Sequence, residues 1–190
     1  MINVVVEGES DRGVAVAIVR AAGHELGKIV VKNGKTKLDP LIPNYNRAAA
    51  TSPWVVLRDS DTRCPVELHA KLTAAIDSVS PSFLLRVVHP MSEGWLLADS
   101  EGFAEHFGIR VATVPRDPES LSHPKATMLQ LCAKSRYRSV RSDMVTSDGR
   151  TGPLYVVRVN EFARDHWDVG KAATNSDSLR RAVDRIRRLA

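Results

Sequence analysis

Short, continuously apolar runs alternate with amphipathic stretches along the first half of the chain. Residues 2–6 are β-branched and apolar, which predicts a buried strand, and the alanine- and valine-rich residues 12–22 that follow predict a helix. Further short apolar runs predict strands within residues 28–32, 54–57 and 82–88. Strands that alternate with helices favour an α/β fold, with a mainly parallel sheet between flanking helices.

A helix is also expected between the last two of these strands, because apolar residues recur there at near-helical spacing. Its apolar face would be formed by Leu68, Leu72, Ile76 and Val79. A helix with such a face would cover one side of the sheet.

Beyond residue 89 the pattern becomes helical. Amphipathic stretches predict helices, and no further convincing strand follows. The expected helices span residues 91–98, 101–107, 124–133, 155–167 and 178–189. We therefore predict an α/β core in residues 1–110 and a helical C-terminal extension in residues 111–190 that packs on this core.

Composition narrows the class of protein. The chain has 190 residues, 43% of them hydrophobic and 26% charged, as in a globular domain with its own core. Its net charge of +5 is compatible with a nucleic-acid partner, although a solvated basic surface explains the charge equally well. Cys64 and Cys132 indicate neither a disulfide framework nor a zinc site. No basic leader or membrane-length apolar run is present, so we expect a cytoplasmic protein without a membrane partner.

Acidic residues follow two of the predicted strands. Glu7 comes after the first strand, and Asp59 and Asp61 come after the third. The carboxyl ends of parallel strands meet at one edge of a sheet, where ligands gather. Alternate residues of an extended chain point the same way, so Asp59 and Asp61 could hold one divalent ion while Glu7 approaches it. Carboxylate oxygens favour Mg²⁺ or Mn²⁺.

An ion at this edge would activate water and neutralise charge on a scissile phosphate, with Glu7 as general base or acid. Each acidic motif also has a purely structural explanation. An Asp-x-Asp after a strand is often turn chemistry, and Glu9, Ser10 and Asp11 could simply cap the first helix. The two motifs in this order along the chain are more specific than either motif alone.

This arrangement resembles the Toprim domain shared by topoisomerases, bacterial primases and OLD-type nucleases. The residues that carry the resemblance are Glu7, Gly8, Ser10, Asp11, Asp59 and Asp61. The resemblance implies a Rossmann-like sheet, a role in acid–base chemistry for Glu7, and Mg²⁺ binding by Asp59 and Asp61. It covers the part of the chain predicted as the α/β core.

A second motif gives a narrower resemblance. Residues 93–99 are similar to the Glu-x-Trp-Leu-Leu-Ala-Asp signature of an uncharacterised bacterial family of small stand-alone Toprim-like proteins, some found near defence or mobile-element genes. Residues 152–154 and 176–179 also resemble the tail of that family. Glu93 follows the strand predicted for residues 82–88 and could join the acidic edge as a ligand or an orienting group. Alternatively, Glu93 serves only the electrostatics of a helix N-terminus.

The departures from the larger relatives narrow the function further. No tyrosine lies in a recognisable cleavage domain, as a topoisomerase would require, and no primase zinc module is present. An OLD-type nuclease would carry its own ATPase, but the nearest string to a Walker A motif, residues 34–36, lacks the first glycine of that motif.

Basic residues supply candidate contacts to nucleic acid. Lys32, Lys35 and Lys37 are expected in a flexible polar loop after the second strand, where they could meet a phosphate backbone or simply be solvated. Arg58 and Arg63 flank the Asp-x-Asp motif and could steady a phosphate or act as counter-ions.

A second basic cluster lies further along the chain. Lys134, Arg136 and Arg138 interleave with Tyr137, a composition suited to single-stranded nucleic acid. His89 is the histidine expected nearest the acidic edge, and we consider it a candidate for phosphate contact.

These observations predict a Mg²⁺- or Mn²⁺-dependent nuclease or related phosphodiester-cleaving enzyme that acts on DNA or RNA, in a bacterial defence or mobile-element system as the resemblance implies. Its catalytic residues would be Glu7, Asp59, Asp61 and Glu93, with the first three as metal ligands. The alternative is a non-catalytic nucleic-acid-binding or scaffold subunit that works with a partner ATPase. A third hypothesis is a metal-dependent phosphotransferase or phosphatase that acts on a nucleotide.

Overall fold

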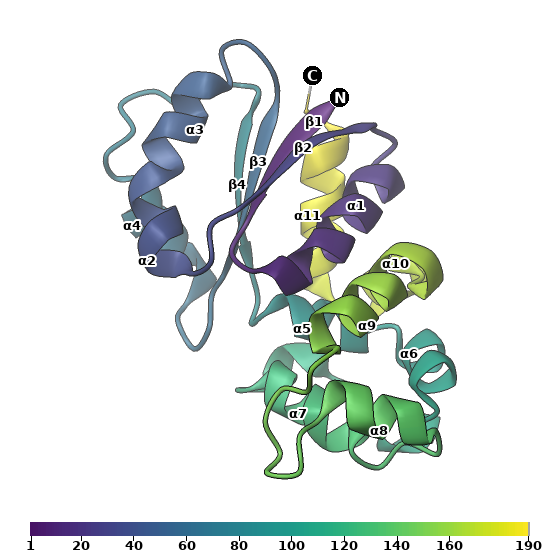
Figure 1. Ribbon diagram of the computed structural model, residues 1–190. Coiled ribbons are helices and arrows are strands. Elements are labelled where there is room, and N and C mark those ends of the chain that lie inside the picture. Colours follow the sequence, from purple (N-terminus) through teal and green to yellow (C-terminus); the bar gives the residue numbers. More distant parts are fainter. Residues whose placement is uncertain (190) are drawn as a thin grey trace.

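A computed structural model describes residues 1–189. In these residues a sheet of four parallel strands runs through the centre, in the order β2-β1-β3-β4 (Figure 1). The strands are β1 (Ile2–Val6), β2 (Leu26–Val31), β3 (Trp54–Asp59) and β4 (Phe83–Val88). Each strand overlaps one of the apolar runs in the sequence, and the predicted α/β class with a parallel sheet is confirmed.

Strand β1 lies in the middle of the sheet, and the pairing of its neighbours positions the acidic residues. Val5 pairs with Val30 of β2 on one side and with Val56 of β3 on the other. Asp59, the last residue of β3, pairs with Val88, the last residue of β4. The carboxyl ends of the strands therefore lie at one edge, where open parallel sheets bind ligands.

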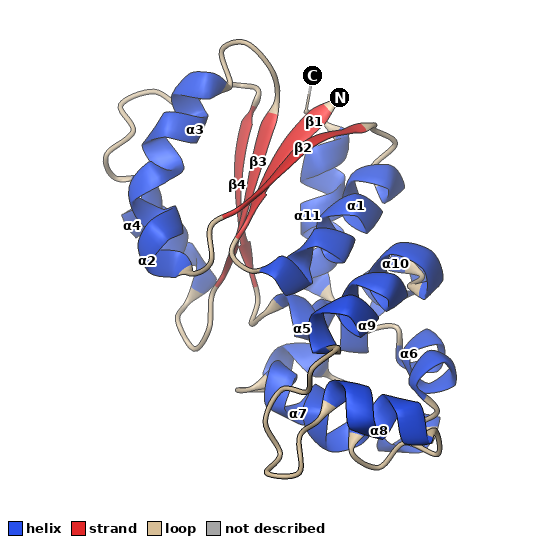
Figure 2. Cartoon of the chain, in the orientation of Figure 1, coloured by secondary structure: helices blue, strands red, loops and turns tan. Residues whose placement is uncertain are grey.

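Helices cover both faces of the sheet (Figure 2). One face carries α1 (Arg12–Ala21) and α11 (Asp177–Arg187), and the other carries α2 (Lys35–Leu38), α3 (Ile42–Ala48) and α4 (Pro65–Thr73). Each face has its own apolar core, because side chains alternate across a strand. Val4 and Val55 belong to the core on the α1 face, whereas Val5 and Val56 belong to the core on the α3 face.

The rest of the chain forms a helical region next to the carboxyl ends of the strands, in the lower part of Figure 1. Its helices are α5 (Ser92–Leu97), α6 (Ser100–Phe107), α7 (Pro124–Cys132), α8 (Arg138–Met144), α9 (Tyr155–Glu161), the π-helical turn η5 (Phe162–His166) and α10 (Val169–Asn175). Short 3-10 turns are η1 (Glu9–Asp11), η2 (Asp39–Leu41), η3 (Val111–Thr113) and η4 (Pro118–Ser120).

One apolar core joins the helical region to the sheet. Trp95, Phe103 and Phe162 belong to the same buried cluster as the residues on the α1 face. Helix α11 then returns to the sheet and contacts both α1 and β4. The end of the chain thus supplies one of the helices that cover the sheet. None of the helices in residues 1–189 is both long and apolar enough to cross a membrane.

One helix is shorter than its apolar spacing predicts. Helix α4 ends at Thr73, and Val79, the last residue of the expected apolar face, is 55% exposed. The side chain of Asn46 in α3 explains this end, because its amide donates to Ser78 O at 2.9 Å and accepts from Ser80 N at 2.9 Å. These two bonds hold the chain in a loop where a helix would otherwise continue.

Residues 32–37 are not the flexible loop that their polarity predicts. Gly34 adopts φ +112°, a conformation that glycine tolerates, and helix α2 begins directly after it at Lys35. Leu38 at the end of α2 is fully buried and belongs to the core on the α3 face. Burial of this single leucine orders a segment whose other residues are polar.

Candidate active site

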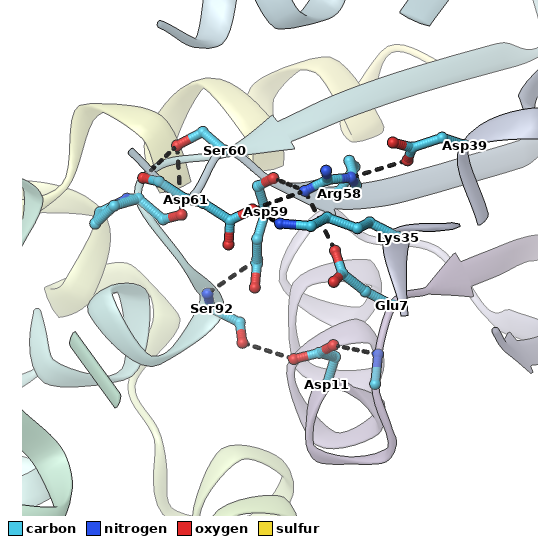
Figure 3. Close-up of polar contacts among 11 residues, drawn as sticks. Glu7, Asp11, Lys35, Asp39, Arg58, Asp59, Ser60, Asp61 and Ser92 are labelled. Carbon is cyan, nitrogen blue, oxygen red and sulfur yellow. Dashed lines mark hydrogen bonds and ion pairs between the residues drawn. The ribbon is translucent and has the colours of Figure 1, made fainter. Parts of the chain in front are cut away.

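Arg58 of β3 lies at the centre of the acidic edge (Figure 3). Its side chain is only 1% exposed, and its Nε donates to Asp39 Oδ1 at 2.9 Å. Its terminal nitrogen NH1 lies 3.3 Å from Glu7 Oε2 and 3.5 Å from Asp61 Oδ2, and it also donates to the main-chain oxygen of Asp59. These are the contacts of a counter-ion to the carboxylates, which is the second of the two roles that the sequence allows for Arg58.

Asp61 and Asp59 face different partners. Strand β3 ends at Asp59, and Asp61 has φ 55°, which is left-handed rather than extended. The alternation expected for an extended Asp-x-Asp therefore does not reach Asp61. The Asp61 carboxylate accepts from Lys35 Nζ at 2.8 Å, and its main-chain nitrogen donates to Pro90 O at 3.0 Å.

Ser92, the first residue of α5, connects Asp59 to Asp11 (Figure 3). The main-chain nitrogen of Ser92 donates to Asp59 Oδ1 at 3.2 Å, and its hydroxyl donates to Asp11 Oδ1 at 2.6 Å. The other oxygen of Asp11 accepts from Gly8 N at 2.8 Å. Asp11 thus closes the 3-10 turn η1 and gives α1 no side-chain capping bond, and it also faces Asp59 across the edge (Figure 3).

Glu93 lies beside this pair. It is 5% exposed and accepts a 2.7 Å hydrogen bond from the hydroxyl of Tyr155 in α9. Burial and the neighbouring Glu93 carboxylate raise the pKa of Tyr155 well above its usual range, so the tyrosine stays a hydrogen-bond donor. The ammonium of Lys125 lies 4.6 Å from the centroid of the Tyr155 ring. Glu93 therefore belongs to the acidic edge, held there by the helical region.

The negative charge of three carboxylates at this edge is not compensated by a direct cation. Within residues 1–189, Asp11, Asp59 and Glu93 form no ion pair, and their hydrogen bonds come from main-chain nitrogens and hydroxyls. Burial, opposed by the Ser92 hydrogen bond, raises the pKa of Asp11 to about 6. Burial also raises the pKa of Asp59, and further contributions come from the charges of Asp11, Glu93, Glu7 and Asp61.

Glu7 is partly buried and, unlike Asp11, Asp59 and Glu93, lies within ion-pair distance of Arg58. Burial raises the pKa of Glu7 above its usual value, and the nearby charge of Arg58 opposes this shift. Its Oε2 atom is buried and makes no hydrogen bond, although it lies within ion-pair distance of Arg58. A carboxyl with a raised pKa releases its proton at a higher pH than an ordinary carboxyl does, which favours a role in proton transfer.

The donors at this edge fit Mg²⁺ or Mn²⁺ in their chemistry, but they are not gathered into a closed coordination shell. No three His, Cys, Asp or Glu side chains in residues 1–189 converge closely enough to surround a metal ion. Mg²⁺ usually retains several waters and takes one or two protein carboxylates. Asp59 is suited to this role because its carboxyl group lies at the strand end and forms no ion pair in residues 1–189. Glu7 is a second candidate, because its Oε2 makes no hydrogen bond, although that atom lies 3.3 Å from Arg58 NH1.

Other basic residues chosen from the sequence are dispersed. Lys35 is at the edge, paired with Asp61, whereas Lys37 and Arg63 are exposed nearby and Lys32 lies 5.9 Å from the centroid of the Tyr45 ring. Three exposed residues lie in the turn between α7 and α8 and at the first position of α8, which Figure 1 shows away from the strand ends: Lys134, Arg136 and Arg138. The Arg136 guanidinium lies 4.8 Å from the centroid of the Tyr137 ring. The structure therefore does not bring the second basic cluster to the acidic edge.

His89 follows β4 and makes hydrogen bonds with side chains after β3 and at the start of α11. Its Nδ1 lies 2.9 Å from the hydroxyl of Ser60, and its main-chain nitrogen donates to Ser178 Oγ at 3.1 Å. These bonds tie the end of β4 to the end of β3 and to α11.

Sequence patterns did not single out several residues of the edge. Asp39, Ser92 and Tyr155 reach it from distant segments, and nothing in their local sequence marks them. Asp11 was visible in the motif after β1 but had an equally good explanation as a helix cap. Only the tertiary contact with Ser92 shows that Asp11 belongs to the acidic edge.

Comparison with protein-family models, with curated proteins and with solved structures finds no match to this chain.

Proposed function

We propose that this chain is a Mg²⁺- or Mn²⁺-dependent enzyme of the Toprim-like class that cleaves phosphodiester bonds in nucleic acid. The observation that carries the proposal is the group of Asp11, Asp59 and Glu93, three carboxylates held together without an ion-pair partner in residues 1–189. Mutual repulsion and burial make this group costly when ionised. A bound divalent cation would remove that cost, which supports a metal role for the edge.

In this proposal Asp59 and Glu7 are the residues that would hold the ion, and Asp61, which is paired with Lys35, would act through a water molecule rather than as a direct ligand. When bound, the ion would lower the pKa of a water molecule and offset the charge of a phosphate group. Glu7 is the proposed proton acceptor or donor, because its pKa is raised and one of its oxygens is unbonded. Lys35, whose side chain is 49% exposed, is placed to contact a phosphate oxygen.

Glu93 and Asp11 act in this proposal as positioning residues. Glu93 belongs to α5, and Asp11, in the turn before α1, is connected to Asp59 through Ser92 of α5. Tyr155 holds Glu93, and Ser92 holds Asp11 and Asp59 at a fixed separation. Their negative charges would strengthen cation binding at Asp59.

The compartment and the biological setting are also proposals. Cys64 is exposed and Cys132 is buried, and both are free thiols, which supports a reducing compartment such as the cytoplasm. The resemblance of residues 93–99 to small stand-alone Toprim-like proteins supports a role in a bacterial defence or mobile-element system, with a separate partner such as an ATPase.

The experiment is a cleavage assay on plasmid DNA, single-stranded DNA and RNA, with Mg²⁺, with Mn²⁺ and with a chelator. We expect metal-dependent cleavage that falls by about 10²–10⁴-fold in Glu7→Gln, the range for loss of a general acid or base. Asp59→Asn should also be inactive. Asp77→Asn is the matched control, because Asp77 is an exposed aspartate in the loop before β4. Cleavage that is absent, or that survives in Asp59→Asn, would count against the proposal.

A second candidate function has an observation of its own. Lys35 and Arg58 already neutralise Asp61 and Glu7, so half of the acidic edge is satisfied without a metal. This pairing favours a non-catalytic nucleic-acid-binding or scaffold subunit that keeps the Toprim shape. Such a subunit would bind nucleic acid without turnover, and its binding would be the same in the presence of a chelator and in Glu7→Gln.

A further inference from the structure

Strand β4 is an edge of the sheet, and a groove of about 470 Å³ runs along it between α4 and α11. Within residues 1–189, β4 pairs with β3 alone. Alternate main-chain N–H and C=O groups of such a strand point outward and can pair with another extended chain. Residues 83–87 of β4 line the groove, so this edge is open to an incoming segment.

The two walls of the groove differ in chemistry. The α4 side carries Pro65, Val66 and Val79, and the two valines are 76% and 55% exposed. The α11 side carries Arg181 and Arg185, which are one helical turn apart. An extended chain laid along β4 would place alternate side chains toward these two walls.

Arg86 of β4 joins the basic wall. It alternates with Leu85 and Val87 along the strand, and its NH2 lies 3.5 Å from Ser178 O at the start of α11. Its Nε atom is buried and has no hydrogen-bond partner. Burial, together with the charges of Arg185 and Arg181, lowers the pKa of Arg86 to about 10. The pKa of His69 on α4 is also lowered, mainly by burial and then by the charges of Arg86 and Arg185.

In the part of the chain that the structure describes, no carboxylate lines the groove beside these arginines. Arg181 pairs with Asp177 on its own helix, but Arg86 and Arg185 form no ion pair within residues 1–189. Most other arginines of α11 do have such a partner, since Arg180 pairs with Asp177 and Arg187 with Asp184. Positive charge that repels itself in a groove is complementary to an acidic ligand.

We propose that this groove binds an extended segment of a partner protein in which apolar and acidic residues alternate, added as a fifth strand beside β4. The apolar side chains would pack on Val66 and Val79, and the carboxylates would pair with Arg86 and Arg185. A second copy of this chain fits less well, because two β4 edges would bring two sets of unpaired arginines together. This proposal is independent of the proposed cleavage activity.

The test uses a fluorescently labelled peptide of three valine–glutamate repeats, matched to the six residues of β4. Fluorescence anisotropy at low ionic strength should show saturable binding to the full chain. Arg185→Glu should weaken binding by about tenfold or more, the effect of reversing one charge of a close pair. Arg188→Glu makes the same change of charge directly after α11 and outside the groove, and its effect should stay below about twofold.

Two further probes separate the explanations. The same peptide with alternate amide nitrogens methylated cannot pair with β4 and should lose binding by about tenfold. Amide NMR signals of residues 84–87 should shift with the unmodified peptide. Equal binding of the methylated peptide, or no binding up to about 1 mM, would overturn the proposal. The arginines would then serve to prevent β4 from pairing with other chains.

The competing occupants have distinct signatures. A single-stranded oligonucleotide that displaces the peptide and is itself weakened by Arg185→Glu would identify the groove as a phosphate-backbone surface instead. Self-association in sedimentation that changes with Arg185→Glu would identify a second copy as the occupant. Both results would overturn the proposal of an acidic partner segment.

Discussion

The hydroxyl of Ser92 donates a 2.6 Å hydrogen bond to Asp11 Oδ1, and this bond joins the start of α5 to the turn before α1. Both residues are buried, and they are 81 positions apart in the sequence. The bond links the α/β layers to the helical region at the acidic edge, so it offers a direct way to probe how that edge is held.

Replacement of Ser92 by alanine should remove this link. Asp11 would remain buried with one donor fewer, and we expect the free energy of unfolding to fall by about 1–3 kcal/mol. The pKa of Asp11 should rise further, because the Ser92 bond lowers it. Urea denaturation measures the first effect. Ser142→Ala is the control, since the exposed Ser142 hydroxyl bonds only within its own helix and to Asp143, and its loss should change stability by less than about 0.5 kcal/mol.

The stability of the metal-free protein should depend on pH through Asp11. The pKa of Asp11 in the folded chain, about 6, lies above its usual value of 3.8. The stabilisation from such a group is fully present below the usual value and is lost as the pH rises through about 6. We expect the free energy of unfolding to decrease by roughly 2–3 kcal/mol between about pH 4 and pH 7, relative to Asp11→Asn.

Urea denaturation of both proteins over this pH range measures the difference. Asp77→Asn should keep the pH dependence of the natural chain, because Asp77 is exposed. Identical pH profiles for the natural chain and Asp11→Asn would show that Asp11 is not held in an unfavourable charged state.

Mg²⁺ or Mn²⁺ should stabilise the folded chain if the acidic edge binds a cation. At a concentration of about 100 times the dissociation constant, the gain is about 2.7 kcal/mol. Thermal unfolding should therefore shift upward with added metal, and Asp59→Asn should abolish the shift. Asp148→Asn should retain it, because Asp148 is an exposed partner of Arg150. Sodium chloride at equal ionic strength separates metal binding from general screening.

Arg58→Met should be the most damaging single change at the edge. Its guanidinium is buried among Glu7, Asp39 and Asp61, and its removal leaves Glu7 and Asp39 without an ion-pair partner in residues 1–189, whereas Asp61 keeps Lys35. We expect a loss of about 3–5 kcal/mol in the free energy of unfolding. Arg63→Met removes an exposed arginine five positions later, in the loop after β3, and should cost less than about 0.5 kcal/mol. Equal stability of the two variants would mean that the ion pairs of Arg58 contribute little.

Local sequence was sufficient for the strands and for the first helix. Residues 2–6 and 83–88 are apolar runs interrupted by a single polar residue each, and such runs need burial on both faces, which a parallel sheet under helices provides. Strand ends then placed Glu7 and Asp59 at one edge, because carboxyl ends of parallel strands share an edge.

Short or polar helices could not be predicted in this way. Helix α2 rests on the burial of Leu38, and the end of α4 depends on Asn46, which is 32 positions from Ser78. Both depend on contacts between segments, which periodicity within one segment does not encode.

The sequence by itself determined the α/β class and the acidic character of the strand ends, because both follow from residue type and local spacing. Tertiary structure alone decided which carboxylates meet a cation and which do not. Arg58 and Lys35 neutralise Glu7 and Asp61, whereas Asp11 faces Asp59 through Ser92. The contacts of Ser92 join residues up to 81 positions apart and require the helical region to pack against the sheet, whereas the contacts of Arg58 and Lys35 depend on the pairing of strands and on α2.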